Sequence, residues 1–431
     1  MQASEYITNL KKGFKEPEIS FEHLPTDFET NFNIDSELLK QLREKRLKED
    51  YAQHLLNRLR HRLNGDYDKL FEEGYIALGE INDPTPNAFT KEFEDSSCAI
   101  IFNSGLRDFI YRVTRALSTR INVNGEDDKS TKSLSFDETC HIIGDIFLWF
   151  KETGQAFGPS YPISKYQLIL ASELASEAES FFLAHELGHI LYRFIDKSDE
   201  YTASLYSEYK SNWVEEFMAD KFALNILLQP IGDDFPYTTR EISYAGAEIG
   251  LLIYSGLEKL GFNFNKSSHP SSNLRIEKLR SYLKNMSPDE NTFNQILSLA
   301  NCNQLLFEKI IEYISSSDYE KFIDKASKDI FLRIEELLNE CTGGPWPDYS
   351  KFKGEVYGLI NQGYSNKLYE RIALASKDFF DITNSNIEDK PNETWVLFQK
   401  YKLFMSCVRE FHEPAKSIFE KALRIKPIFN I

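Results

Sequence analysis

The segment Phe181–Ile190 reads FFLAHELGHI and places two histidines, His185 and His189, four positions apart. On an α-helix this spacing projects both imidazoles from one face, where they can share a metal ion. Glu186 stands beside the first histidine and can reach a water molecule on that metal. The flanking residues are apolar, so the rest of this helix is expected to be buried. The competing interpretation is a buried helix whose histidines are satisfied by hydrogen bonds alone.

A second helical stretch follows at Trp213–Leu228, with the sequence WVEEFMADKFALNILL. Glu216, Ala219 and Asp220 form an ExxAD pattern in it. Glu216 can supply a third metal ligand, and Asp220, one turn later, can accept a hydrogen bond from a ligand histidine and fix its tautomer. Glu215 is the competing ligand, but it points about 100° away from Glu216 on a helix. The alternative is an ordinary surface helix with acidic residues.

A third candidate element is the run Ser268-His269-Pro270, with Arg275 shortly after it. His269 can donate a hydrogen bond to the oxyanion of a tetrahedral intermediate, and Arg275 can orient an acidic ligand. The alternative is that Pro270 starts a helix and that His269 is only a loop residue. The residues alone do not favour either interpretation.

Together these residues predict a hydrolytic zinc site. Three protein ligands, His185, His189 and Glu216, leave one coordination position open for water, as a catalytic zinc ion requires. Glu186 is the predicted general base, which takes a proton from the water and passes it to the leaving amine. His269 is the candidate second electrophile. Two histidines and one glutamate suit Zn²⁺, although the ligand types also admit another divalent metal.

Charge and cysteine usage limit the partners and the compartment. The chain has 431 residues and a formal net charge of −17, which argues against general nucleic-acid binding and against docking on anionic membranes. Its five cysteines are scattered, so a reducing cytoplasm is expected. The N-terminal residues lack the apolar segment of a signal peptide, and no apolar stretch is long enough to span a bilayer. We therefore expect a cytoplasmic protein without a membrane partner.

One segment runs against the acidic balance. Basic residues dominate Lys40–Arg62, within a stretch whose leucines recur at helical spacing. This segment is either a docking face for an acidic partner or the solvated face of an amphipathic helix, and the second interpretation is favoured. Binding of nucleic acid through it is the least favoured function.

Sparse glycine and proline favour helices over a turn-rich β fold, so the expected fold class is mainly α (α+β). A short apolar run, Cys98–Phe102, is expected to be a buried strand, whereas residues 1–33 and 66–97 look irregular. Ser104 is the expected N-cap of the helix after that strand. Further helices are expected over residues 136–153, 165–194, 212–228 and 241–260. The predicted domains are a mostly helical N-terminal region (1–97), a zinc metallopeptidase domain (98–285) and an α-helical C-terminal domain (286–431).

The order HExxH, ExxAD, HP and R resembles that of gluzincin-type metallopeptidases. The stretch Glu216–Leu228 is similar to one in the ImmA/IrrE-like peptidases, and the spacing most resembles the Lit-type phage-exclusion peptidases, over about residues 98–283. The resemblance implies a zincin-like core with a small β-sheet, followed here by an additional helical domain. It also implies a bacterial endopeptidase with a protein substrate and a role in phage defence. It carries the zinc ligands to His185, His189 and Glu216, and the general base to Glu186.

Two classes of function therefore compete. The first is a zinc endopeptidase with tight substrate choice, in phage defence or stress regulation. The second is a zinc-containing regulatory or binding protein, with a latent or inactive peptidase site, that acts through a protein partner at its C-terminal helices. The fourth zinc position separates them, because an open position favours an enzyme and a side chain in it favours structure or latency.

Overall fold

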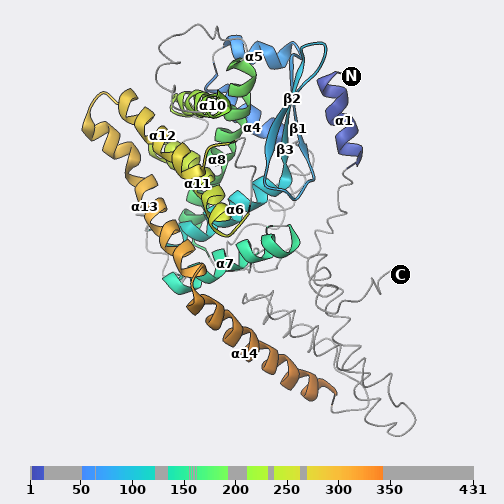
Figure 1. Cartoon of the computed structure of the whole chain (residues 1–431), viewed down its shortest axis with the longest axis vertical. Coiled ribbons are helices and arrows are strands. Elements are labelled where there is room, and N and C mark those ends of the chain that lie inside the picture. Colours follow the sequence, from blue (N-terminus) through green and yellow to red (C-terminus); the bar gives the residue numbers. More distant parts are fainter. Residues whose placement is uncertain are drawn as a thin grey trace. The chain divides into compact units, whose positions relative to one another are not determined.

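The computed structural model describes residues 2–13, 51–63, 65–121, 134–154, 156, 158, 161, 163–192, 211–231, 237–262 and 269–342 (Figure 1). The chain divides into two compact units. Unit 1 comprises Met1–Leu134 with Pro162–Lys309, and unit 2 comprises Ser135–Tyr161 with Ile310–Ile431. The three domain ranges expected from the sequence are a different division and stay a prediction. The structure confirms a mainly helical α+β fold, with a small three-stranded sheet in the described residues.

The sheet of unit 1 is built on a central buried strand. Strand β3 (Cys98–Asn103) is buried along its whole length, as expected for this apolar run. Strand β1 (Ile76–Ile81) pairs with it in parallel, and β2 (Ala88–Glu92) pairs with it antiparallel, in the order β1-β3-β2. The expectation of irregular structure over residues 66–97 is therefore wrong. The two outer strands are short and mixed in polarity, so their alternation is weak in the sequence.

Helices cover both faces of this sheet. Helix α1 (Ala3–Gly13) lies on one face, although residues 1–33 were expected to be a loose lead-in. Its Ala3 and Ile7 form a core cluster with Ile81, Ala99 and Ile101. Helices α6 (Ser104–Ser118) and α8 (Lys165–Tyr192) contact β3 as well. Since side chains alternate along a strand, Ile100, which lies between Ala99 and Ile101, faces the α6 and α8 side.

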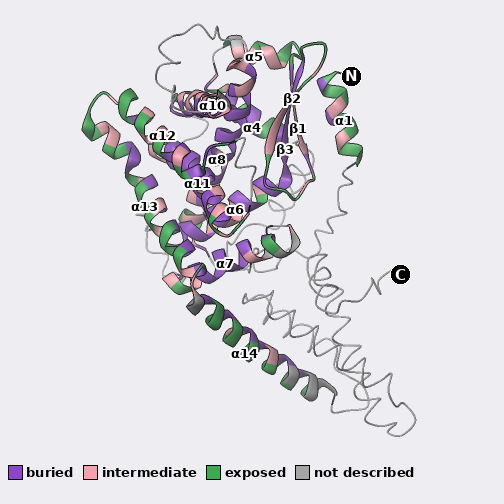
Figure 2. Cartoon of the chain, in the orientation of Figure 1, coloured by how far each residue is buried: buried purple, intermediate pink, exposed green. Residues whose placement is uncertain are grey.

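Helix α8 is the central element of unit 1. It packs against α4 (Tyr51–Arg60), α6, α10 (Ser211–Leu227) and α11 (Arg240–Lys259), as well as against β2 and β3. Most of its residues beyond Leu174 are buried on every side (Figure 2). A helix that is buried on every side must be enclosed by other elements, which explains why so many helices surround this one.

Small residues allow α11 to lie close to α8. A Cβ atom added to Gly246 would lie 2.5 Å from the Cβ atom of Glu177, and one added to Gly250 would lie 2.7 Å from the ring of Phe182. Real side chains do not approach so closely, so the glycines set the distance between the two helices. The alanine- and glycine-rich sequence of residues 241–260 therefore serves close packing, as expected.

Helix α4 is joined to α8 by buried ion pairs. Arg58 pairs with Glu173 and with Oε1 of Glu177. Arg62, just after the end of α4, pairs with Oε2 of Glu177. The side chains of both arginines and of Glu177 are almost fully buried. These two members of the basic segment Lys40–Arg62 therefore do not form a docking face. Residues 40–50 of that segment lie outside the described residues.

The other helices of unit 1 lie close to their predicted bounds. The expected helices over 165–194, 212–228 and 241–260 appear as α8, α10 and α11, each shifted by two residues or fewer at either end. Asn103 rather than Ser104 occupies the N-cap position of α6, and its side chain makes no capping hydrogen bond. Short helix α5 (Gly65–Glu72) precedes the sheet, and α12 (Ser272–Met286) follows residue 271 with Ser271 as its N-cap.

Unit 2 contains α7 (Phe136–Thr153) and α14 (Ser317–Thr342), while α13 (Glu290–Ile314) begins in unit 1 and ends in unit 2. Ser135 and Glu138 close a full capping box at the start of α7. His141 stacks on the ring of Phe322, with 4.0 Å between ring centroids. Burial among these rings lowers the pKa of His141 to about 4, so it is a neutral packing residue. None of the described helices combines the length and the apolar character needed to cross a bilayer.

We predict that Gly246→Val separates α11 from α8 and destabilises the protein, because its side chain would overlap the backbone and side chains of α8. Overpacking of this kind lowers the free energy of unfolding by about 1–3 kcal/mol. Denaturant titration measures the loss. Gly65→Ala is the control, since an added Cβ atom there meets nothing within 4 Å. Equal stability of the two variants would contradict the prediction.

Candidate functional site

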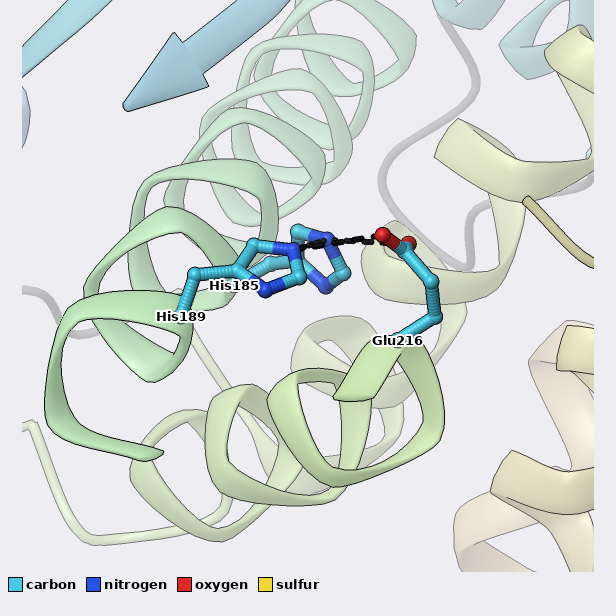
Figure 3. A group of neighbouring side chains, drawn as sticks. All are labelled: His185, His189 and Glu216. Atoms are coloured by element: carbon cyan, nitrogen blue, oxygen red, sulfur yellow. Dashed lines mark hydrogen bonds and ion pairs between the residues drawn. The ribbon is translucent and has the colours of Figure 1, made fainter. Parts of the chain in front are cut away.

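Helix α8 presents His185 and His189 on the same face, as their spacing predicts. Their Nε2 atoms lie 3.1 Å apart, and the rings are almost perpendicular at 87° (Figure 3). His185 is buried and His189 is partly exposed. The two nitrogens therefore converge at the edge of the core, where one side remains accessible.

Helix α10 brings Glu216 to the same point. Its Oε2 lies 3.5 Å from Nε2 of His185, and its Oε1 lies 3.4 Å from Nε2 of His189. In Figure 3 the carboxylate extends from α10 toward both rings. Glu215, the competing candidate, is partly exposed and acts on Tyr192, whose pKa is raised by burial and by this carboxylate. Of the two glutamates, Glu216 is the one that the structure places with the histidines.

The close approach of α8 and α10 depends on two small residues of the motifs. A Cβ atom added to Gly188 would lie 2.9 Å from the Cα atom of Ala219. The glycine of HELGH and the alanine of EFMAD are therefore in contact across the helix pair. Larger side chains at either position would move Glu216 away from the histidines. The motifs thus specify the helix spacing as well as the polar groups.

The three side chains fit a divalent metal ion. Each offers one ligand atom, and the three atoms lie within 4.8 Å of one another. Tetrahedral ligands at about 2.1 Å from zinc lie roughly 3.4 Å apart, close to the separations observed here. Oε2 of Glu216 is buried and has no hydrogen-bond partner in the described residues. The guanidinium Nη1 of Arg275 lies 3.8 Å from this oxygen, beyond hydrogen-bond distance, so the oxygen is left to bind a metal ion directly. The donor set and its geometry suit zinc.

Asp220 and Arg275 support this group from behind. Oδ1 of Asp220 lies 2.8 Å from Nδ1 of His185. Arg275, on α12, donates two hydrogen bonds to the same carboxylate, from Nε to Oδ2 at 2.8 Å and from Nη2 to Oδ1 at 2.5 Å. A proton on Nδ1 of His185 would be donated to Asp220, which leaves the Nε2 lone pair free for a metal. Arg275 thus holds the carboxylate that orients His185, and Nη1 of Arg275 also lies 3.8 Å from Glu216.

Burial and pairing shift the pKa values of this cluster. Burial and the charge of Arg275 act to lower the pKa of His185, but hydrogen bonds to Asp220 and Glu216 outweigh them and raise it to about 9. Burial acts to raise the pKa of Glu216, but hydrogen bonds from His185 and His189 lower it far below its ordinary value. The pKa of Asp220 is lowered too, because Arg275 outweighs the effect of burial. Without a metal the site therefore holds both carboxylates ionised around a protonated His185.

Glu186 lies next to this cluster and is held by the sheet. Oγ1 of Thr90, on β2, donates a hydrogen bond to Oε2 of Glu186 at 2.8 Å. Glu186 itself is nearly buried. The glutamate is therefore tied to β2 as well as to its own helix.

His269 reaches the site from the residues before α12. Its Nε2 lies 3.4 Å from Oε1 of Glu216, although the side chain is 56% exposed. The His-Pro element thus lies beside the metal-binding group, and its helix begins at Ser272 rather than at Pro270. Contacts join six of the seven residues singled out from the sequence, and Glu186 is next to His185 in α8, with its side chain bonded to Thr90. The chemical roles of all seven stay predictions.

Sequence reasoning missed two neighbours of the site. Thr90 lies in the segment that was expected to be irregular. Tyr254, on α11, donates a hydrogen bond to the carbonyl of Pro86 at 2.6 Å. Burial raises the pKa of Tyr254, the charge of Arg275 acts to lower it, and the charge of Glu186 adds to the increase. No local sequence signal marks either residue, since both reach the site through tertiary packing.

We predict that zinc affinity rises with pH below about pH 9. A metal binds the neutral imidazole, and His185 is protonated below its pKa of about 9, so it must lose a proton on binding. This group alone changes the apparent affinity by up to about tenfold per pH unit. Calorimetry in two buffers of different ionisation enthalpy measures affinity and proton release together. Asp220→Asn should weaken the pH dependence, and an affinity independent of pH would contradict the prediction.

Comparison with known proteins gives one match. The model of the family Peptidase U49 matches residues 154–297, about a third of the chain. The matched range contains both histidines of HELGH, Glu216, Asp220, His269 and Arg275. Neither a curated protein nor a solved structure matches the chain significantly. The match to a peptidase family, over the residues that form this cluster, supports a peptidase.

Proposed function

We propose that this chain is a zinc-dependent endopeptidase that hydrolyses a peptide bond of a specific protein substrate. The observation that carries the proposal is the convergence of His185, His189 and Glu216 at the separations of zinc ligands. Glu186, next to His185 in the same helix, is the proposed general base. The match of residues 154–297 to a peptidase family supports the same reaction class.

The residues of the chain divide the work of hydrolysis. A zinc ion bound by His185, His189 and Glu216 would polarise the scissile carbonyl and lower the pKa of the attacking water. Glu186 takes a proton from that water as its oxygen bonds to the carbonyl carbon, and then delivers the proton to the leaving amine nitrogen. His269 donates a hydrogen bond to the oxyanion as the carbonyl becomes tetrahedral.

The proposed setting is bacterial phage defence or stress regulation. The resemblance to Lit-type and ImmA/IrrE-like peptidases supports a protein substrate and such a role. Residues 286–431, predicted from the sequence to be helical, are proposed to select that substrate or another protein partner. Both α13 and α14 carry a large exposed apolar side chain, Leu305 and Leu332 respectively. A cytoplasmic location stays a prediction from cysteine usage.

We predict that Glu186→Gln abolishes cleavage while zinc stays bound. The amide cannot accept the proton, so turnover should fall by about 10²–10⁴-fold. A scan for new protein N-termini, in an extract treated with wild type or variant, identifies the substrate and measures the loss. Zinc content by elemental analysis should be unchanged.

Glu215→Gln is the matched control for this experiment, because it alters a neighbouring glutamate of α10 that does not meet the histidines. It should cleave as wild type does. An active Glu186→Gln variant would exclude the proposed base. A zinc-loaded wild type that cleaves neither the extract nor itself would exclude the endopeptidase.

A second candidate function is a latent or regulatory zinc protein, and the position of His269 favours it. Its Nε2 lies as close to Glu216 as that of His189 does, at 3.4 Å. A histidine at that point can either occupy the fourth zinc position or donate to the oxyanion. The large exposed fraction of the His269 side chain supports donation to the oxyanion, because an exposed side chain can move aside when a substrate binds.

We predict that His269→Ala lowers kcat by about 10²-fold, the usual effect of losing one oxyanion donor. Zinc content and KM should change little. Steady-state kinetics on the identified substrate measures both constants, and His61→Ala, which removes another exposed histidine, serves as the control. Increased cleavage by His269→Ala would instead identify His269 as the group that keeps a latent site closed.

A further inference from the structure

One contact to Glu186 is not explained by the metal cluster. Oγ1 of Thr90 lies 2.8 Å from Oε2 of Glu186 and 3.3 Å from the main-chain carbonyl oxygen of the same residue. The hydroxyl has a single hydrogen, so the shorter contact, to the carboxylate, is the hydrogen bond. A hydrogen bond to an ionised acceptor is about twice as strong as one between neutral groups.

The direction of Thr90 is fixed by the strand on which it lies. Phe89 packs against the α1 cluster, and the ammonium group of Lys91 lies 4.0 Å from the ring centroid of Tyr6 on α1. Successive side chains of a strand point to opposite faces, so Thr90 faces away from α1 and toward α8. Pairing of Thr90 with Ile100 on the buried strand β3 fixes its position along the strand.

The side chain of Glu186 needs such a support. A glutamate has three rotatable side-chain bonds, and holding it in one orientation costs free energy in lost rotamer freedom. The bond from Thr90 uses only Oε2, so Oε1 is left to exchange a proton. Because threonine is branched at Cβ, its χ1 angle is restricted. Its hydroxyl is therefore held in a fixed position relative to the sheet, and so is the carboxylate bonded to it.

We propose that Thr90 is a positioning residue for the general base, which holds the Glu186 carboxylate in the orientation that accepts a proton. This inference rests on the proposed peptidase function. Thr90 does not touch the substrate or the metal ligands in this role, and it acts only through Glu186. The sheet therefore contributes to the chemical step, although all the metal ligands and the base itself lie on helices.

The test compares Thr90→Val with Thr90→Ser. Valine keeps the shape and the β-branch but removes the hydroxyl, so kcat should fall by about ten- to a hundredfold while KM stays within about twofold. Serine keeps the hydroxyl and should restore kcat to within about threefold of wild type. Zinc affinity, measured by competition with a chelator, should be unchanged in both. Lys91→Gln, on the other face of β2, is the control and should retain full kcat.

A double-mutant cycle gives a readout that does not require turnover. The free energy of unfolding is measured for the zinc-loaded wild type, Thr90→Val, Glu186→Ala and the double variant. If the two side chains interact, the two single effects should not add, whereas independent residues would give additive effects.

The outcomes separate this inference from the proposed function. An active wild type with an inactive Glu186→Gln variant, but with full kcat in Thr90→Val or with additive unfolding effects, would overturn the role of Thr90 alone. A Thr90→Val variant that lost zinc affinity or raised KM without lowering kcat would also overturn it. An inactive zinc-loaded wild type would overturn the peptidase and this role together.

Discussion

The structure of unit 1 depends on the burial of ionisable side chains along one helix. Within α8, Glu177, Glu179, His185 and Glu186 are all buried, where an unpaired charge is strongly destabilising. Each has a partner on a neighbouring element: Arg58 on α4 with Arg62 just after it, Tyr51 at the start of α4, Asp220 on α10 and Thr90 on β2. Each of these buried ionisable groups of α8 thus has a polar or charged partner on a neighbouring element. The elements around α8 are thus selected for their polar partners as well as for their apolar faces.

The state of Glu179 illustrates how far this burial extends. Burial raises the pKa of its carboxyl group to about 8, although the hydroxyl of Tyr51 and the charge of Arg107 act to lower it. The group is thus largely protonated at neutral pH, and Tyr51 contacts it directly. In contrast, Asp220 is ionised at the same pH because Arg275 lies against it. Two buried carboxyl groups of unit 1 therefore differ in charge: Glu179 is largely neutral and Asp220 is ionised, because their partners differ.

The sequence predicted the helical part of this arrangement well and the sheet poorly. The helices α8, α10 and α11 are long and have clear periodicity or composition, so pattern alone located them. The geometry of a helix also favoured Glu216 over Glu215, since only one of the two can share a face with Asp220. Strands β1 and β2 are short, and β2 reads AFTKE, which has little apolar character. Their existence depends on pairing with β3. Thr90 and Glu186 lie 96 positions apart, so the two could not be linked from the sequence.

The buried arginines of α4 have a consequence for dividing the chain into fragments. Arg58 and Glu177 lie 119 positions apart in the sequence, yet they share a hydrogen bond in the core. A truncated protein that starts at the sheet would leave the Glu177 carboxylate enclosed without its countercharges, at a cost of about 3–5 kcal/mol. It would also remove the buried apolar side chains of α4, among them Leu55 and Leu59, and uncover the surfaces of α8 and β1 against which α4 packs. The smallest fragment of unit 1 expected to fold by itself therefore includes α4. Its N-terminal boundary lies before Tyr51, far upstream of His185, the first residue of the zinc motifs.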